Sequence, residues 1–249
     1  MASLIAILDR HRADFHPVVP FDAAKDRLFP FDFTELNTSL SPEAIANTDQ
    51  FATWINHTLH QHHARYGIGG YGEHRTLYAR SAHFDQPVMV ARAGSEAPRT
   101  GSINTAEATE TEPRRLHLGV DIWGPAGTKV MAPLDGIVHS FAFNNNDSDY
   151  GATIILTRNL DGTPFHTLYG HLSLNSLKNL YEGQKVTKGE VLAEFGMRFE
   201  NGNWPPHLHF QIIADMLGWK GDYPGVCRFS ERMQWLANCP DPNIILKMM

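Results

Sequence analysis

The sequence predicts a mainly β domain, α+β overall, built as an open antiparallel sheet or β-sandwich with a helical N-terminal extension. From residue 116 onward, short apolar and β-branched runs alternate with turn residues. Ahead of them, one segment at 48–66 has the apolar spacing of a helix. With 42% hydrophobic and 19% charged residues, the composition is that of a globular chain.

The N-terminal extension is predicted at residues 1–75, and its clearest element is the helix at 48–66. Thr48 or Asp49 can cap this helix, and Gly67 is placed to end it. The apolar face follows i, i+3, i+4 and i+8 spacing through Phe51, Trp54, Ile55 and Leu59. The polar face carries four histidines, for which we predict solvent exposure because no carboxylate or cysteine completes a ligand set: His57, His60, His62 and His63.

The domain itself is predicted at residues 76–249, with a catalytic core at about 114–215 and a C-terminal extension. Residues 93–113 are rich in Gly, Ser, Thr and Glu, which predicts a long loop that borders a functional cleft. A short helix is expected at 232–236. The predicted strands cover 129–132, 136–141, 152–157, 166–172, 191–195 and 207–213.

Charge, cysteine content and the N-terminus restrict the partners. The net charge is −6 without a Lys/Arg-rich run, so we expect no nucleic-acid or membrane partner. The first residues lack the pattern of a secretory signal, and no apolar run reaches the roughly 18 residues of a membrane span, which predicts a cytoplasmic protein. Cys227 and Cys239 are expected to be buried free thiols.

Three histidine clusters in the β region have the residue types of a metal site. Neutral imidazole and carboxylate are good zinc ligands. In a straight strand His117 and Asp121 would lie about 13 Å apart, so the chain is expected to bend near residues 118–119. His207 and His209 are two residues apart and would share one face of a strand at about 7 Å. This separation suits one metal ligand beside one histidine that reaches the substrate, with His171 available as acid or base.

The ordered set of motifs resembles the lysostaphin/LytM-type zinc metallopeptidases. A His-x-x-x-Asp motif starts at residue 117, a Gly-His follows at 170–171, and a His-x-His precedes a hydrophobic strand at 207–209. Framework turns at 124–138 and 183–190 match as well, and the likeness covers 116–213, about two-fifths of the chain. The resemblance implies the duplicated hybrid motif fold, an open antiparallel sheet with one zinc ion at the floor of a groove.

The resemblance also implies roles for five residues. His117, Asp121 and His209 match the zinc ligands, and His171 and His207 match the paired catalytic histidines. The implied substrate is a peptide bond, peptidoglycan-like or in a small peptide. Other details resemble a cytosolic branch of the family, which implies a small cytosolic peptide or amide. Family relatives often carry an N-terminal segment that supplies a fourth metal ligand, and the polar stretch 71–75 is the candidate here, with plain packing against the sheet as the default.

Two other classes of protein stay open from the sequence. One is a zinc-containing binding module without turnover. The other is a IIA-type histidine phosphocarrier, which the His-Leu-Gly-Val-Asp run and the turn at 182–190 also resemble. The blander interpretation, that each histidine is a hydrogen-bonded polar residue of a sheet, is the default for any single histidine but not for five in family order.

Overall fold

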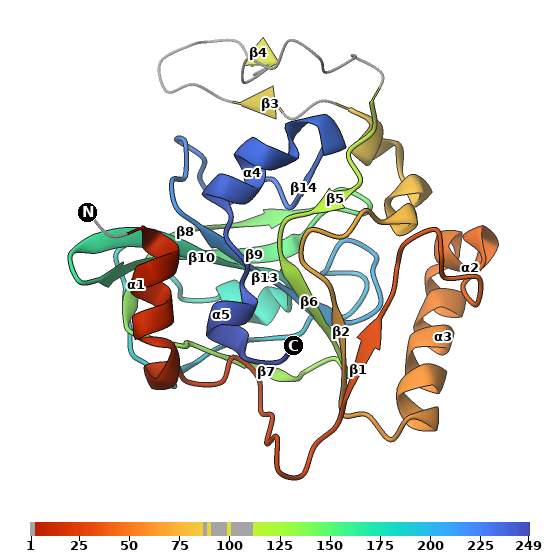
Figure 1. Cartoon of the computed structure of the whole chain (residues 1–249), viewed down its shortest axis with the longest axis horizontal. Coiled ribbons are helices and arrows are strands. Elements are labelled where there is room, and N and C mark those ends of the chain that lie inside the picture. The colour runs from red at the N-terminus through yellow and green to blue at the C-terminus, as the bar shows by residue number, and fades with distance from the viewer. Residues whose placement is uncertain (1–2, 87–88, 91–98, 101–111) are drawn as a thin grey trace.

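The computed structural model describes residues 3–86, 89–90, 99–100 and 112–249. A large mixed sheet of eight strands organises the molecule (Figure 1). From one edge to the other its strands are β1 (Leu28–Phe31), β2 (Tyr66–Gly69), β6 (Val120–Trp123), β13 (His207–Ile213), β10 (Thr163–Leu172), β9 (Gly151–Leu160), β8 (Gly136–Asn144) and β11 (Lys185–Val186). All neighbouring pairs are antiparallel except β1 and β2, which are parallel. The predicted β-rich fold is therefore confirmed.

Shorter elements surround the sheet. Two-stranded ladders join β5 (Leu116–His117) to β14 (Val226–Cys227), β7 (Lys129–Met131) to β12 (Val191–Glu194), and β3 (Met89–Val90) to β4 (Arg99–Thr100). The α-helices are α1 (Leu4–Arg10), α2 (Pro42–Ala46), α3 (Thr48–Gln61), α4 (Arg232–Asn238) and α5 (Asn243–Leu246). Short 3-10 helices span Arg12–Asp14, Thr76–Arg80, Ala82–Asp85, Leu174–Leu177 and Phe229–Glu231.

The predicted helix exists, but its ends differ from the prediction. Asn47 is the N-cap, and its side chain accepts hydrogen bonds from the backbone N–H groups of residues 49 and 50, both at 3.1 Å. The helix ends at Gln61, and Gly67 lies inside strand β2 instead of closing a helix. A side chain at Gly67 would collide with the ring of Phe31, since a Cβ there would lie 2.0 Å from its Cε2 atom. Close strand packing, not helix termination, explains this glycine.

The N-terminal residues are built into the sheet. β2 pairs with β6, the strand that carries Asp121, and β1 extends the sheet beyond β2. Helix α3 packs its buried face on an aromatic cluster that includes Phe31, Phe33 and Trp123. A second apolar core lies between the sheet and the two chain ends, where α1 and α5 contribute Leu8 and Ile245. The predicted domain limits at 75 and 76 stay a prediction.

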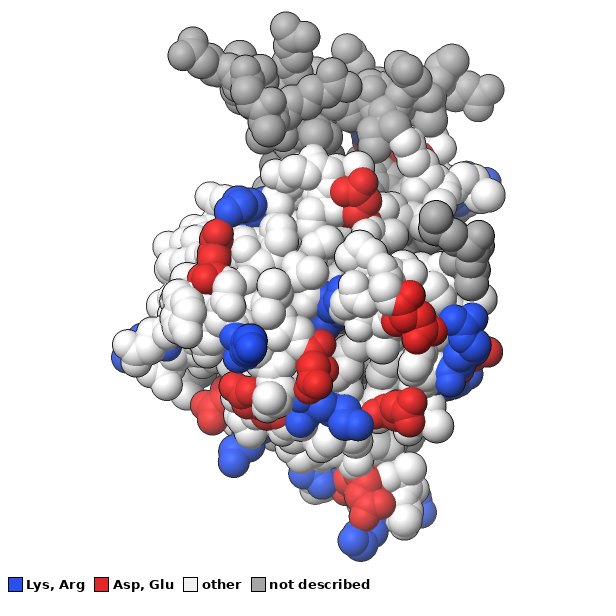
Figure 2. Space-filling view, turned by 90° about the vertical axis from the view of Figure 1, so that its left-hand side faces the viewer, with Lys and Arg blue, Asp and Glu red and all other residues white. Residues whose placement is uncertain are grey.

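Several smaller expectations can be checked. The four histidines of α3 and its C-cap region are exposed, as predicted: His57, His60, His62 and His63. Cys227 and Cys239 are buried and free. On the face in Figure 2, acidic and basic side chains are interspersed. Most of the loop predicted at 93–113 lies outside the described residues. In the part of the chain that the structure describes, no helix is long and apolar enough to cross a membrane.

Candidate active site

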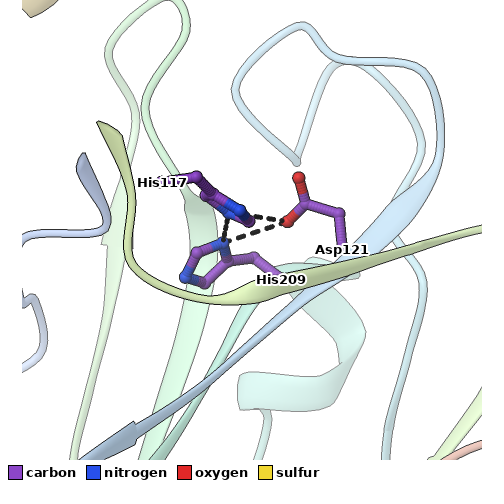
Figure 3. Close-up of side chains that lie close together, drawn as sticks. All are labelled: His117, Asp121 and His209. Atoms are coloured by element: carbon purple, nitrogen blue, oxygen red, sulfur yellow. Dashed lines mark hydrogen bonds and ion pairs between the residues drawn. The ribbon is translucent and has the colours of Figure 1, made fainter. Parts of the chain in front are cut away.

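Three side chains from three strands converge at one buried point (Figure 3). His117 ends β5, Asp121 lies in β6 and His209 lies in β13. The Oδ1 atom of Asp121 is 3.3 Å from Nε2 of His117 and 3.0 Å from Nδ1 of His209. The two ring nitrogens are themselves 3.0 Å apart. Zinc bound tetrahedrally at about 2.0–2.2 Å requires ligand atoms a little more than 3 Å apart, so the three atoms fit one ion.

The expected bend between His117 and Asp121 is present. β5 pairs with β14, whereas β6 leaves that ladder and pairs with β2 and β13. Leu118 and Gly119 form the turn between them. Gly119 lies directly against the third ligand, because a Cβ there would come 2.5 Å from Cε1 of His209. The absence of a side chain at this position therefore leaves room for the imidazole.

Outer contacts fix which ligand atoms face the cluster. The Nδ1–H of His117 donates to the carbonyl of Gly70 at 3.1 Å, which leaves Nε2 free for a metal. The Nε2–H of His209 donates to Oε1 of Gln211 at 2.9 Å, which leaves Nδ1 free. A carbonyl or amide behind each ligand imidazole is the usual arrangement of metal centres, because it sets the tautomer.

The protonation states suit metal binding. Burial lowers the pKa of His117 to about 4, and the nearby positive charge of Arg75 acts in the same direction. Burial alone would raise the pKa of Asp121, but the charges of His117 and Arg75 outweigh it and hold that pKa well below its ordinary value. Neutral imidazole and ionised carboxylate are the forms that bind a divalent ion. The donor set therefore fits zinc chemically as well as geometrically.

His171 is held beside the cluster by an irregularity of the sheet. The β9–β10 register shifts between Tyr169 and Leu172, and His171 at the shift has a left-handed backbone, with φ of 62°. Its Nδ1–H donates to the carbonyl of Asn201 at 2.8 Å, so Nε2 keeps its lone pair. Such backbone strain occurs at functional sites, where the surrounding structure imposes it.

His207 is fixed in a similar way from the neighbouring strand. Its Nδ1–H donates to the carbonyl of Pro205 at 2.8 Å, and its ring stacks on Trp123 with centroids 3.9 Å apart. The rings of His171 and His207 are 4.1 Å apart. Burial lowers the pKa of His207 to about 4, and burial together with the charge of His207 lowers the pKa of His171 well below its usual range. Both imidazoles are therefore neutral at pH 7 and able to accept a proton.

A cleft of about 390 Å³ opens over these residues. Its walls are largely aromatic, with charged groups at Arg114, Asp149 and Asp222. Burial and the neighbouring charge of Asp149 raise the pKa of Asp222 to about 6. The aromatic residues of the lining are Tyr78, Phe84, Trp123, Tyr150, Trp204, Trp219 and Tyr223. An apolar cleft with a few convergent polar groups is the usual form of a small-molecule or peptide site.

Some residues of the site were not identified from the sequence. Gln211 lies two residues after His209, so strand alternation could have placed it on the same face. Tyr150 is not among the predicted site residues, yet its hydroxyl lies 3.3 Å from Nε2 of His209. The stretch 71–75 is the candidate for a fourth ligand, with packing against the sheet as the default. Among the described residues the metal cluster contains only three, and Arg75 of that stretch pairs with Asp121 instead.

A buried His–Asp–His cluster beside two neutral histidines in the cleft of a β-sheet has the donor types of a catalytic metal site. The family follows from the sequence comparison, in which residues 115–220 match the model of peptidase family M23. Over these residues the resemblance to the lysostaphin/LytM-type metallopeptidases is confirmed.

Similar proteins share this part of the chain. An uncharacterized metalloprotease of Haemophilus influenzae is 36% identical over 98 residues, 39% of this chain and 18% of that protein. The DD-carboxypeptidase/endopeptidase Mpg of Neisseria meningitidis serogroup B is 36% identical over 97 residues, 39% of this chain and 20% of that protein. The L-Ala--D-Glu endopeptidase of Bacillus subtilis is 30% identical over 107 residues, 41% of this chain and 31% of that protein. The chain thus spans less than a third of the length of these curated relatives.

Among solved structures, the catalytic domain of lysostaphin from Staphylococcus simulans is similar at 22% identity with a TM-score of 0.36, over 74% of this chain and 96% of that chain. A zinc-containing peptidase from Vibrio cholerae is similar at 28% identity with a TM-score of 0.32, over 39% of this chain and 27% of that chain.

Proposed function

We propose that this chain is a zinc-dependent peptidase that hydrolyses a peptide or amide bond with one zinc ion per chain. The observation that supports the proposal most directly is the set of three ligand atoms about 3 Å apart. In both histidines the other ring nitrogen is hydrogen-bonded outside the cluster, which leaves the ligand nitrogen free for a metal. His117 would hold the ion through Nε2, Asp121 through Oδ1 and His209 through Nδ1. Three protein ligands leave a further position open, as catalytic zinc sites require.

The metal, when bound, supplies a Lewis acid that polarises the substrate carbonyl and lowers the pKa of water toward about 7. The protein supplies the rest. His171 and His207 present unprotonated Nε2 atoms at the cleft, where they orient the attacking water and accept its proton. The imidazole that has accepted this proton then carries an Nε2–H, which donates to the developing oxyanion and passes its proton to the leaving amine, and the other imidazole keeps its Nε2 as a hydrogen-bond acceptor.

The substrate we propose is a peptide, either peptidoglycan-like or small and free. The names of two relatives support this, since one is a DD-carboxypeptidase/endopeptidase and another an L-Ala--D-Glu endopeptidase. The aromatic side chains of the cleft suit apolar groups of a peptide, and lining residues such as Arg114, Asn146 and Ser148 offer hydrogen bonds to its backbone.

The test begins with metal analysis of protein purified without added metal, before and after zinc is offered. Zinc-loaded protein is then incubated with peptides that contain an L-Ala–D-Glu bond, peptides that end in two D-residues, and all-L peptides of the same composition. We expect about one zinc per chain and cleavage that a chelator stops and zinc restores, detected by mass spectrometry. Absence of zinc uptake would overturn the metal site. Zinc uptake without cleavage of any of these peptides would instead indicate a binding module.

A further inference from the structure

Arg75 is the most deeply buried cation next to the metal cluster. Its side chain has an exposed fraction of 0%. A guanidinium withdrawn from water is strongly unfavourable unless carboxylates and hydrogen-bond acceptors surround it. Arg75 has two carboxylate partners, Asp121 and Glu73. One of these is also a residue of the cluster, so the arginine lies one contact away from the ion that the cluster would hold.

In the contact with Arg75, the two carboxylate oxygens of Asp121 have different partners. Nη1 of Arg75 donates to Oδ2 at 2.5 Å. The other oxygen, Oδ1, points at the two histidine nitrogens, 3.0 and 3.3 Å away. An occupied Oδ2 keeps the carboxylate from rotating, so only Oδ1 is offered to the metal. A charge-assisted hydrogen bond of this kind is short and directional, as the orientation of a ligand requires.

Arg75 is itself held rigidly. Nε donates to Oε2 of Glu73 at 2.6 Å, and Oε1 of Glu73 accepts from the backbone N–H of Phe33 at 3.2 Å. Nη2 donates to the carbonyl of Gly70 at 3.3 Å, the same carbonyl that accepts from Nδ1 of His117. The guanidinium also lies over the ring of Phe33 at 5.3 Å. Segment 70–75 therefore contacts two of the three cluster residues from outside.

We propose that Arg75 is a positioning residue of the metal centre, which orients Asp121 so that Oδ1 alone binds the ion. The inference rests on the proposed function only in requiring a metal at the cluster. Arg75 lies outside residues 115–220, the part that matches the family model. The metal centre of this chain thus depends on its N-terminal segment, and the matched region by itself lacks one of the groups that hold it.

A purely structural role for Arg75 makes a different prediction. If the arginine only fastened segment 70–75 to the sheet, its loss would lower stability and leave the zinc affinity of the folded protein unchanged. If it orients Asp121, its loss lets the carboxylate rotate and offer both oxygens. Removal of a group that is hydrogen-bonded to a metal ligand lowers metal affinity by about 10–100-fold in other metal centres, and we expect a loss in this range here.

The chain offers a matched control in Arg158, another buried arginine. Its exposed fraction is 1%, and it donates to Oγ1 of Thr167 at 3.1 Å and to the hydroxyl of Tyr169 at 2.9 Å. None of these groups belongs to the cluster. Arg158→Met removes a buried guanidinium of the same size and leaves the surroundings of Asp121 intact.

The experiment compares wild type, Arg75→Met and Arg158→Met by zinc competition against a chromophoric chelator, with thermal unfolding as the folding check. The Co²⁺-substituted proteins are compared by their visible spectra, because tetrahedral Co²⁺ absorbs more strongly than five-coordinate Co²⁺. We expect Arg75→Met alone to bind zinc about 10–100-fold more weakly and to lose visible absorption at saturating Co²⁺. Wild-type affinity and spectrum in folded Arg75→Met would overturn the inference.

Arg75→Lys serves if Arg75→Met does not fold. It keeps the charge but not the planar fork of donors, so we expect a folded protein with zinc affinity between those of wild type and the methionine variant. Affinity equal to wild type in Arg75→Lys would then overturn the positioning role. Failure of wild type itself to bind zinc would instead overturn the proposed function, so the two failures are distinguishable.

Discussion

Two regions of this chain are rich in histidine, and their surroundings are opposite. The end of α3 and the residues after it place His57, His60, His62 and His63 in water. The sheet buries an equal number at the cleft, His117, His171, His207 and His209. In the sheet, four different acceptors hold the four rings, namely the carbonyls of residues 70, 201 and 205 and the side-chain amide of Gln211. Burial and fixed tautomers, not the number of histidines, distinguish a metal centre from a solvated surface.

The largest expected effect separates the two regions directly. His117→Ala, Asp121→Ala and His209→Ala should each abolish zinc retention, because each removes one of three ligands. Replacing all four exposed histidines by glutamine should leave the zinc content unchanged and the stability within about 0.5 kcal/mol. Elemental analysis after gel filtration measures both. Full zinc occupancy in all three alanine variants would contradict the ligand assignment. Zinc loss in the glutamine variant would show that the exposed histidines bind metal as well.

The next effect divides the sheet histidines among themselves. His171→Ala and His207→Ala should retain zinc but lower kcat by about 10²–10⁴-fold, the usual contribution of general acid–base catalysis. Steady-state kinetics on the best peptide of the substrate screen, with zinc content measured on the same samples, checks this. Undiminished kcat in both variants would show that neither imidazole takes part in proton transfer.

A third effect concerns pH and the metal-free protein. Burial lowers the pKa values of His117, His166 and His207 to about 4 from the ordinary 6.5. As the pH falls below about 6.5, these three histidines bind protons in the unfolded chain, whereas in the folded chain they stay neutral until about pH 4. The contribution of these three histidines to the free energy of unfolding is therefore fully present above pH 6.5 and is lost progressively between pH 6.5 and 4.

Urea unfolding of chelator-treated protein at pH 7.5, 6.0 and 5.0 measures this loss. The decline should be smaller in His166→Gln, which removes one of the three groups at a distance from the metal cluster. A free energy of unfolding that is constant across this pH range would contradict the neutral, buried state of the sheet histidines.

The smallest effect lies on the helix that bears the exposed histidines. Asn47→Ala should destabilise the protein by about 0.5–2 kcal/mol, because it leaves two backbone N–H groups of α3 without their cap. Asp49→Ala is the control, since that side chain makes only an exposed ion pair with Arg198 and should cost about 1 kcal/mol or less. Thermal melts measure both, and neither should change the zinc content. A larger loss of stability in Asp49→Ala than in Asn47→Ala would instead indicate that residue 49 caps the helix.

Much of this protein could be predicted from local sequence. Short apolar and β-branched runs between turn residues located the strands that carry His171 and His209, because such residues favour strands and turn residues mark where a strand ends. Helical spacing located α3, and the bend at Gly119 followed from the distance that a straight strand would impose. The ends of α3 were placed less well, since Asn47, Thr48 and Asp49 are all good caps and only the packed backbone selects one.

The residue types and their order along the chain thus predict the class of chemistry that we propose, with two imidazoles and a carboxylate for a metal and two more imidazoles for proton transfer. Tertiary structure alone decided how these groups are held. The pairing of β2 with β6 brings Arg75 and Gly70 to the cluster from more than 40 residues away in the chain. No local sequence pattern predicts such a contact, because the contact depends on which strand pairs with the strand that carries Asp121. The affinity of the centre is therefore a property of the whole sheet, while its chemistry is already present in the sequence.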